Sequence, residues 1–196
     1  MNITLLDPLG AAISLTCVYY STKAQARAWI LGLIALLINA WLYYQKGIYG
    51  HLMRDCLYFF LMFFGLYSWL FGGKNKTPLP ISTLSFKKGL FLGGCTVLGI
   101  CITSYFLKHF TTSQIPYWDA TTTSLALVAQ WLLCRKIIAC WAVWFVADAL
   151  TVGLHFYQGI PFHSAIHAIY LFLAVLGYLR WKKKMDPIPQ DYSRAI

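Results

Sequence analysis

Two tryptophans and one aspartate within the apolar stretch 137–156 have the residue types and the spacing of a site for a flat organic cation. Trp141, Trp144 and Asp148 are separated by three and four residues, which places both indoles and the carboxylate on one face of a helix. The rings can stack on an aromatic cation, with a cation–π attraction of about 1–2 kcal/mol, and the carboxylate balances its charge. The alternative is that both indoles pack in the core and Asp148 bonds to a neighbouring helix.

A glutamine in the preceding apolar stretch is a second candidate for substrate contact. Gln130 carries an amide, which can both donate and accept hydrogen bonds and can therefore read a carboxamide, a pyrimidine or a ribose hydroxyl. It could equally bond two helices together. Arg135 and Lys136 follow at the end of that stretch, and we interpret them as anchors that orient the chain.

Asp119 follows Trp118 at the start of the stretch 120–134. We expect its carboxylate to cap the N-terminus of that helix, where unpaired backbone N–H groups and the positive end of the helix dipole meet an acid. Asp7 is expected to do the same for the first helix. A role for Asp119 in substrate entry is the alternative.

These residues must be positioned by helices that lie in a membrane. The chain is 59% hydrophobic and 11% charged, its mean hydropathy is +0.61, and it has too few polar side chains to cover a soluble globule of 196 residues. Apolar stretches suited to crossing about 30 Å of hydrocarbon predict seven spans, at 8–22, 28–44, 52–71, 89–107, 120–134, 137–156 and 162–181.

The basic residues lie at the ends of these stretches, which argues against nucleic-acid binding and indicates an orientation. Placing the C-terminus in the cytoplasm puts 13 lysines and arginines inside and leaves only Lys46, Arg54 and Lys108 outside. The positive-inside rule then predicts an external N-terminus and a cytoplasmic C-terminus. The N-terminus lacks the features of a cleaved signal, so we expect the first span to be retained.

An internal duplication relates two groups of three spans. Residues 7–69 align without a gap on residues 119–181 at a constant offset of 112, and the identical pairs include Asp7/Asp119, Trp29/Trp141, Gly47/Gly159, Ile48/Ile160, His51/His163, Tyr58/Tyr170, Gly65/Gly177 and Trp69/Trp181. Three crossings would deliver the second copy upside down, so the span 89–107 must act as an inverter. The predicted units are 1–72, the linker and inverter 73–111, the second repeat 112–184 and a cytoplasmic tail 185–196.

The predicted fold is therefore an all-α integral membrane protein of seven helices in a 3+1+3 arrangement with parallel repeats. This is a transporter arrangement of the sugar-carrier SWEET type, with the substrate between the halves. A duplicated bundle could also be a scaffold or a channel. The duplication maps Asp55 onto His167, and we expect these two to face each other as an ion pair or outer gate, unless Arg54 and Asp55 simply lie among headgroups.

The histidines and cysteines do not indicate a metal site or an enzyme. His163 and His167 have i, i+4 spacing, but the five histidines are accompanied by no glutamate and no HExxH motif. The six cysteines lack paired metal-binding spacing and are interpreted as packing residues. No Walker motif or nucleophile elbow is present. We therefore predict no metal, no cofactor and no catalytic residue.

An ordered set of motifs resembles the PnuC family of bacterial vitamin transporters along nearly the whole chain. The second half carries it in 115–119 (IPYWD), Arg135-Lys136, Trp141-x-x-Trp144-x-x-x-Asp148, 157–160 (YQGI) and 177–181 (GYLRW), and the first half in Asn39, 45–49 (QKGIY) and 65–69 (GLYSW). Two positions depart from the family pattern. Family members carry Asn or Asp at the position of Asp148, and Arg54-Asp55 stands where Leu-Gln is expected.

The resemblance implies an inner-membrane carrier for a vitamin precursor, most often nicotinamide riboside, with thiamine and riboflavin carriers among its relatives. It implies facilitated diffusion by alternating access, trapping by cytoplasmic phosphorylation, and a possible homotrimer. Family binding residues carry over onto Gln130, Trp141, Trp144 and Asp148, and Asp55, His167, Asp119, Asn39 and Tyr170 are candidates for gating or secondary contacts. An acid at 148 favours the cationic cargoes, nicotinamide riboside or thiamine, over neutral riboflavin. An ion channel or a membrane enzyme is the alternative from another class.

Overall fold

The computed structural model describes residues 3–45, 49–111, 115–157 and 161–185, and within them the chain is helical. Seven α-helices and one 3₁₀ turn follow in the order α1 (Ile3–Thr22), α2 (Arg27–Gln45), α3 (Tyr49–Phe71), η1 (Lys74–Lys76), α4 (Phe86–Phe110), α5 (Pro116–Cys134), α6 (Cys140–Tyr157) and α7 (Pro161–Met185). The only β pairing among the described residues is a single bridge between Ser82 and Ile137. The all-α prediction with seven helices is confirmed.

Each predicted span lies within its helix, apart from the first residues of the sixth. The span predicted from residue 137 begins as a helix only at Cys140, because Lys136 has a φ of 54° and the chain turns there. The amide of Ile138 bonds to the carbonyl of Ser82 at 2.9 Å instead of entering α6. Hydropathy alone could not separate this turn from the helix, since the turn is itself apolar.

The two groups of three helices repeat each other in local structure. The bounds of α5, α6 and α7 equal those of α1, α2 and α3 shifted by 112, to within two residues. The connecting turns also match: Ala24 has a φ of 57° and Lys136 a φ of 54°. In both turns this left-handed residue donates its backbone N–H three residues back, to Ser21 and to Leu133 respectively. The same turn is therefore built twice from different residues.

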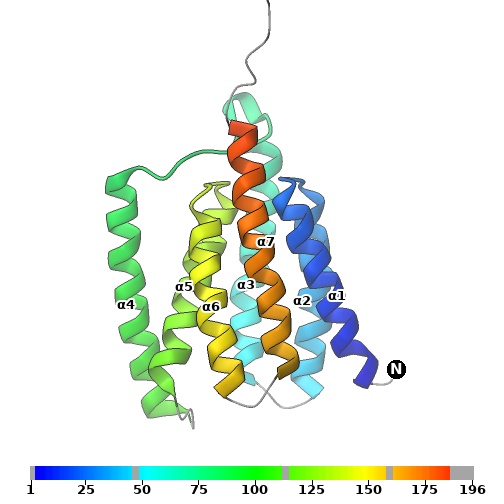
Figure 1. Cartoon of the computed structure of the whole chain (residues 1–196), viewed down its shortest axis with the longest axis vertical. Coiled ribbons are helices and arrows are strands. Elements are labelled where there is room, and N and C mark those ends of the chain that lie inside the picture. Colours follow the sequence, from blue (N-terminus) through cyan, green and yellow to red (C-terminus); the bar gives the residue numbers. More distant parts are fainter. Residues whose placement is uncertain (1–2, 46–48, 112–114, 158–160, 186–196) are drawn as a thin grey trace, which may run out of the picture.

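Six of the helices form a closed ring. Each packs against two ring neighbours, in the order α1, α2, α3, α5, α6, α7 and back to α1. Figure 1 shows this ring from the side, with α7 in front of α3. The two groups of three helices meet along two seams, which we call the α1–α7 seam and the α3–α5 seam. All six helices thus surround a common axis.

The remaining helix, α4, stands outside the ring and packs against α5 (Figure 1). The contact point is close, because a Cβ added at Gly99 would lie 3.3 Å from the Ser124 hydroxyl. Elsewhere α4 presents large apolar side chains outward, among them Phe86, Leu90 and Phe91. In length and composition α4, α6 and the Ser164–Met185 part of α7 are each sufficient to cross a membrane.

The linker between α3 and α4 covers one end of the ring. Leu79 donates its backbone N–H to the carbonyl of Trp69, and Ser82 bonds to the turn before α6. Ile81 and Leu84 pack against the buried core beneath them. This end, which also holds the C-terminal ends of α3 and α7, is called the covered end below; it lies at the top of Figure 1.

Candidate functional site

A buried acid–imidazole pair lies halfway between the two ends of the six-helix ring. Asp148 is the ninth of the 18 residues of α6 and is 5% exposed. The Nδ1 of His167, on α7, lies 2.7 Å from the Oδ1 of Asp148, within hydrogen-bonding distance. A carboxylate at this depth needs a partner because leaving the hydrocarbon-embedded charge alone costs at least about 2.5 kcal/mol. The partner comes from the next helix of the same half.

His167 was expected to face Asp55 across the pseudo-axis, and that expectation is wrong. The imidazole pairs with Asp148, the acid on the neighbouring helix. Asp55 itself is 6% exposed on α3, and it has an interaction of its own. Alignment at an offset of 112 relates positions in two repeats, but equivalent positions need not meet, because each seam joins non-equivalent helices.

Aromatic rings extend the acid–imidazole pair toward the first half. The ring centroid of His167 lies 5.4 Å from that of Tyr170 in an edge-on arrangement, and 5.1 Å from that of His155. The Tyr170 hydroxyl in turn interacts with Ser14 on α1. The pair therefore connects α6 through α7 to α1, across the α1–α7 seam.

Gln130 is buried on α5, and it keeps an unused donor. The residue is 4% exposed, and its Nε2 has no hydrogen-bond partner among the described residues. Leaving a buried amide donor unpaired costs about 1–3 kcal/mol, so such groups are rare unless a ligand or water completes them. Its counterpart in the first repeat is Val18, whose side chain has no polar group that requires a hydrogen bond.

Trp141 belongs to a layer of four tryptophans near the covered end, which we call the tryptophan layer: Trp29, Trp69, Trp141 and Trp181, all at most 3% exposed. Their rings meet in sequence, Trp29 to Trp69 at 5.3 Å, Trp69 to Trp181 at 5.8 Å and Trp181 to Trp141 at 5.4 Å between centroids. The indole of Trp141 thus packs in the core, which was the alternative to substrate contact.

Two glycines make room for the outer members of this layer. A Cβ at Gly177 would lie 2.5 Å from Trp141, and one at Gly65 would lie 2.2 Å from Trp29. The indole N–H groups of Trp141 and Trp29 both lack a partner among the described residues. Because both copies share this feature, the unpaired N–H of Trp141 is less specific to a ligand than the amide of Gln130.

The inner members of the layer tie the two halves together by equivalent bonds. Trp69 donates its Nε1–H to the carbonyl of Leu133 at 2.9 Å, and Trp181 donates to the carbonyl of Ser21 at 3.0 Å. Donors and acceptors are both related by the offset of 112. Each half therefore binds the other with the same bond. The internal duplication makes Trp69 and Trp181 equivalent in sequence but does not show that their rings meet. Their shared position near the ends of two equivalent helices was the available signal.

Trp144 occupies a place that the first repeat fills differently. Its counterpart Gly32 is buried, and a Cβ there would meet Met62 and Cys17 at 3.0 and 3.2 Å. The residues equivalent to Met62 and Cys17 are the buried Ala174 and Ala129. Large and small side chains are thus exchanged between the copies. Trp144 is partly buried and packs against the core that includes the tryptophan layer.

Two further candidates lie apart from these residues. Asp119 is not the N-cap residue of α5, because the helix begins at Pro116, whose fixed φ suits a first helical position, and Ile115 is the N-cap. Asp119 does lie in the first turn, where an acid meets the positive end of the helix dipole. Asp7 likewise lies within α1 and does not precede it. Asn39 lies against α1, since a Cβ at Gly10 would come within 2.7 Å of its Oδ1.

Some expectations fall outside the described side chains, namely those on Arg54, His163 and the side chain of Asp7. Within the described part of the chain, no group of three His, Cys, Asp or Glu side chains could hold a metal ion. The described cysteines are all free thiols.

Comparison with known proteins gives consistent matches over the whole described region. The family model described as nicotinamide mononucleotide transporter matches residues 4–183. The chain is similar to the nicotinamide riboside transporter PnuC of Neisseria mucosa, 27% identical over 191 residues covering 91% of this chain and 72% of that protein. PnuC of Escherichia coli is 20% identical over 220 residues covering 100% and 91%. The riboflavin/roseoflavin transporter RibM of Streptomyces davaonensis is 24% identical over 141 residues covering 68% and 66%.

A solved structure has the same architecture. The crystal structure of the vitamin B3 transporter PnuC superimposes with a TM-score of 0.73 at 26% identity, covering 92% of this chain and 81% of the crystallised one. Together with the seven helices, this likeness extends over both groups of three helices and the helix between them.

Proposed function

The chain belongs to the family described as nicotinamide mononucleotide transporter, the PnuC family, and we propose that it imports nicotinamide riboside across the cytoplasmic membrane. It is a multi-pass membrane protein and not an enzyme, as its relatives are named transporters. The proposed cargo is the one named in the PnuC relatives. The N-terminus is proposed to lie outside and the covered end in the cytoplasm, as the basic residues favour.

The observation that carries the choice of cargo is a buried carboxylate halfway along the ring, together with a buried amide donor that lacks a partner among the described residues. Asp148 supplies negative charge, and Gln130 supplies an unused N–H. Nicotinamide riboside has a cationic pyridinium and a carboxamide oxygen. The first matches the acid, and the second matches the amide donor.

A mononucleotide fits this chemistry less well than the riboside. Its phosphate would bring negative charge to a region where Asp148 is already an acid. The lysines and arginines of the described helices lie toward the helix ends, and the ion-pair partner of Asp148 among the described residues is His167. A phosphate normally needs such cations, so we favour the uncharged ribose end.

Each of the predicted site residues has a proposed role. Trp144 would stack on the pyridinium, and Trp141, held by Gly177, would form the floor of the site and offer its free N–H. Asp148 would balance the pyridinium charge or accept a ribose hydroxyl through the oxygen that His167 leaves unused. Gln130 would donate to the carboxamide oxygen. Substrate binding would thereby complete donors that are otherwise unsatisfied.

The tryptophan layer is proposed to be the cytoplasmic closure of an alternating-access carrier. It lies at the covered end, and its two cross-half bonds, from Trp69 and Trp181, would break when the halves rock apart. The matching bonds support a symmetric motion of two similar three-helix units. Opposite this end the described helices show no equivalent aromatic layer, so the same contacts would not close both sides.

Transport by facilitated diffusion is sufficient for this role. Phosphorylation of the riboside in the cytoplasm would convert it to an anion that the site disfavours for the reason given above, and import would continue without coupling to an ion gradient. This trapping step belongs to a separate enzyme. It needs no catalytic residue in this chain.

Thiamine is the second candidate, because its thiazolium is also an aromatic cation that an acid at position 148 would favour. Riboflavin, the cargo named for RibM, is neutral and gains nothing from that acid. The test is a competition binding assay on purified protein with labelled nicotinamide riboside. Unlabelled riboside should displace the label, whereas displacement by thiamine and not by the riboside would transfer the function to thiamine.

A further inference from the structure

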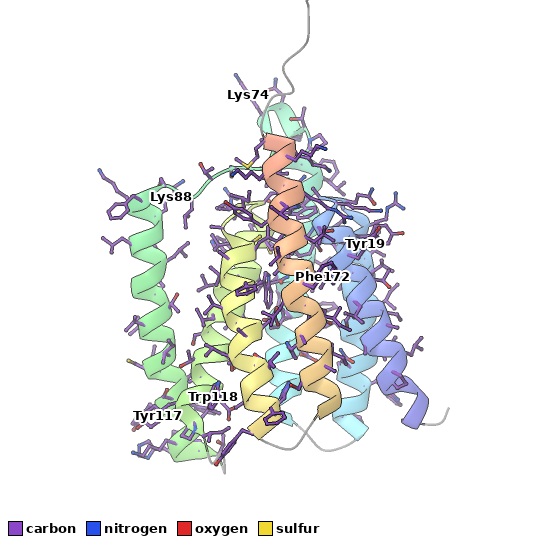
Figure 2. All side chains as sticks on the ribbon, in the orientation of Figure 1. Tyr19, Lys74, Lys88, Tyr117, Trp118 and Phe172 are labelled. Atoms are coloured by element: carbon purple, nitrogen blue, oxygen red, sulfur yellow. The ribbon has the colours of Figure 1, made fainter. Side chains whose placement is uncertain are left out.

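Three cationic side chains meet at the cytoplasmic end of the α1–α7 seam. The guanidinium of Arg180 lies 5.3 Å from the ring centroid of Tyr19, and the ammonium of Lys23 lies 4.4 Å from the same ring. Lys184 donates its Nζ to the carbonyl of Lys23 at 2.6 Å. Figure 2 places Tyr19 near this end of the molecule, toward the end where Lys74 lies. We call this group the Tyr19 cluster.

The positions of these cations are set by bonds that leave most of their donors free. Arg180 gives one N–H to the Thr22 hydroxyl at 2.7 Å, and Thr22 is fully buried. A guanidinium has five donors and an ammonium three. Arg180 and Lys23 also bond to the Tyr19 hydroxyl, and Lys184 is held by its one bond to the Lys23 carbonyl. Several N–H groups of the three cations therefore remain available for an anion.

No carboxylate among the described residues pairs with the Tyr19 cluster. The one ion pair between described side chains joins His167 to Asp148, far along the helices from this end. The charge of the cluster also acts on a neighbour: burial, and after it the charge of Lys184, lowers the pKa of Lys136 in the turn before α6. Three like charges held together at one point favour an anionic ligand.

The α3–α5 seam lacks this arrangement, although it is the equivalent place in the other half. The offset of 112 replaces Arg180 by Ser68, Lys184 by Gly72 and Tyr19 by Trp131, and only the lysine at 23 has a cationic counterpart, Arg135. Trp131 instead stacks on Phe64 with centroids 5.3 Å apart. The repeat alone therefore does not explain the cluster.

We propose that the Tyr19 cluster binds the phosphate of one anionic phospholipid of the cytoplasmic leaflet. Below it, α7 presents an exposed apolar row along which acyl chains can lie, formed by Phe172, Val175 and Leu179. Phe172 lies on α7 on the same side of the molecule as Tyr19 (Figure 2). Juxtamembrane cations attract anionic headgroups by about 1 kcal/mol each, and tyrosine is favoured at this depth.

Such a lipid would bridge the two halves of the ring, because Lys23 is next to α1 and Arg180 is on α7. It would hold the α1–α7 seam together without contacting the cargo site. The inference goes beyond the proposed function and does not depend on which vitamin is carried. It uses only the orientation that places this end in the cytoplasm.

The test is native mass spectrometry of the delipidated full-length protein titrated with phosphatidylglycerol or with phosphatidylcholine of the same acyl chains. The wild type should retain one phosphatidylglycerol in preference to phosphatidylcholine. Lys23→Gln and Arg180→Gln should each weaken that retention about fivefold, as the loss of one cation near the surface predicts. Arg135→Gln, the matched change at the other seam, should leave it unchanged.

Three results would overturn the proposal. They are equal retention of both lipids, an equal loss in Arg135→Gln and Lys23→Gln, or displacement of the lipid by millimolar inorganic phosphate, which would show a free-anion site. Arg180→Lys keeps the charge and should retain the lipid, so it separates a binding effect from misfolding in Arg180→Gln. Failure of vitamin binding would leave these outcomes unaffected.

Discussion

At the scale of single residues, comparison of the two repeats distinguishes residues expected to bind the cargo from residues that pack the helices together. The first repeat has Leu36, Val18 and Gly32 at the positions equivalent to Asp148, Gln130 and Trp144. Trp29 and Trp141, which both copies share, pack in the tryptophan layer, and Trp141 is in addition proposed as the floor of the site. Asp148 with its buried charge, Gln130 with its unused donor and Trp144 are present in only one copy, and we expect them to meet the cargo.

Asp148→Asn should weaken binding of nicotinamide riboside about tenfold or more, because a bond to a charged group is worth about 1.5–3 kcal/mol. The reduced dihydro form of the riboside is uncharged and serves as the matched ligand; its affinity should change little. Calorimetric titration of both ligands makes the comparison. An equal loss for both would mean that the carboxylate acts through packing and not through charge.

Gln130→Leu should lose affinity for the riboside without losing stability, since its Nε2 bonds to no described residue. Removing a buried unpaired donor is neutral or stabilising for the free protein. Thermal unfolding with and without riboside measures both effects: the midpoint without ligand should stay or rise, and the ligand-induced shift should shrink. A large drop in the ligand-free midpoint would assign Gln130 to interhelical bonding.

The sequence predicted which of these residues are buried, but it did not predict which residues contact each other. Burial of Asp148 and Gln130 followed from their place in apolar stretches. The partner of His167 did not, because the choice between Asp148 and Asp55 depends on how the helices rotate and which helices are neighbours. The Tyr19 cluster was likewise hidden, because its two pairs, Tyr19 with Lys23 and Arg180 with Lys184, are over 150 residues apart in sequence.

At the scale of elements, helix packing is controlled by small residues beneath the tryptophan layer. Gly177→Ala and Gly65→Ala should each destabilise the protein by about 1–3 kcal/mol, because the new methyl would overlap an indole at 2.5 or 2.2 Å. Gly93→Ala is the matched control on α4, where nothing lies within 4 Å. Denaturant unfolding in detergent gives the three values. A destabilisation of Gly93→Ala equal to the others would contradict the packing explanation.

The cross-half bonds predict equal effects at two distant positions. Trp69→Phe and Trp181→Phe each remove one N–H donor to a carbonyl of the other half. Each should raise the rate at which a membrane-impermeant maleimide, added from the cytoplasmic side, labels the buried Cys140. The background would carry Ala at the exposed Cys56, Cys95 and Cys101. Unchanged labelling rates in both variants would show that the tryptophan layer does not close the cytoplasmic side.

Helix positions were predictable because length and hydropathy determine them, and the error of three residues at α6 came from an apolar turn. The position of the linker over the covered end was not predictable, since the linker is polar and its bonds to the α5–α6 turn involve only backbone groups. Backbone pairing of this kind leaves little trace in side-chain pattern.

At the scale of the whole molecule, six helices form a ring whose halves exchange one pair of equivalent bonds at the covered end. A buried acid, Asp148, lies halfway along α6 in the second half. The order of helices in the ring explains why equivalent residues do not touch: the seams join α1 to α7 and α3 to α5. In the alternating-access cycle that we propose, the halves separate at one end while the cargo stays between them.

The most direct test is uptake of labelled nicotinamide riboside into proteoliposomes that contain the purified protein and no kinase. The riboside should enter until its inner and outer concentrations are equal, with or without a pH or sodium gradient, and a Trp144→Ala/Asp148→Ala double variant should not exceed protein-free vesicles. Absence of uptake by the wild type, accumulation above the outer concentration, or full activity of the double variant would contradict the account.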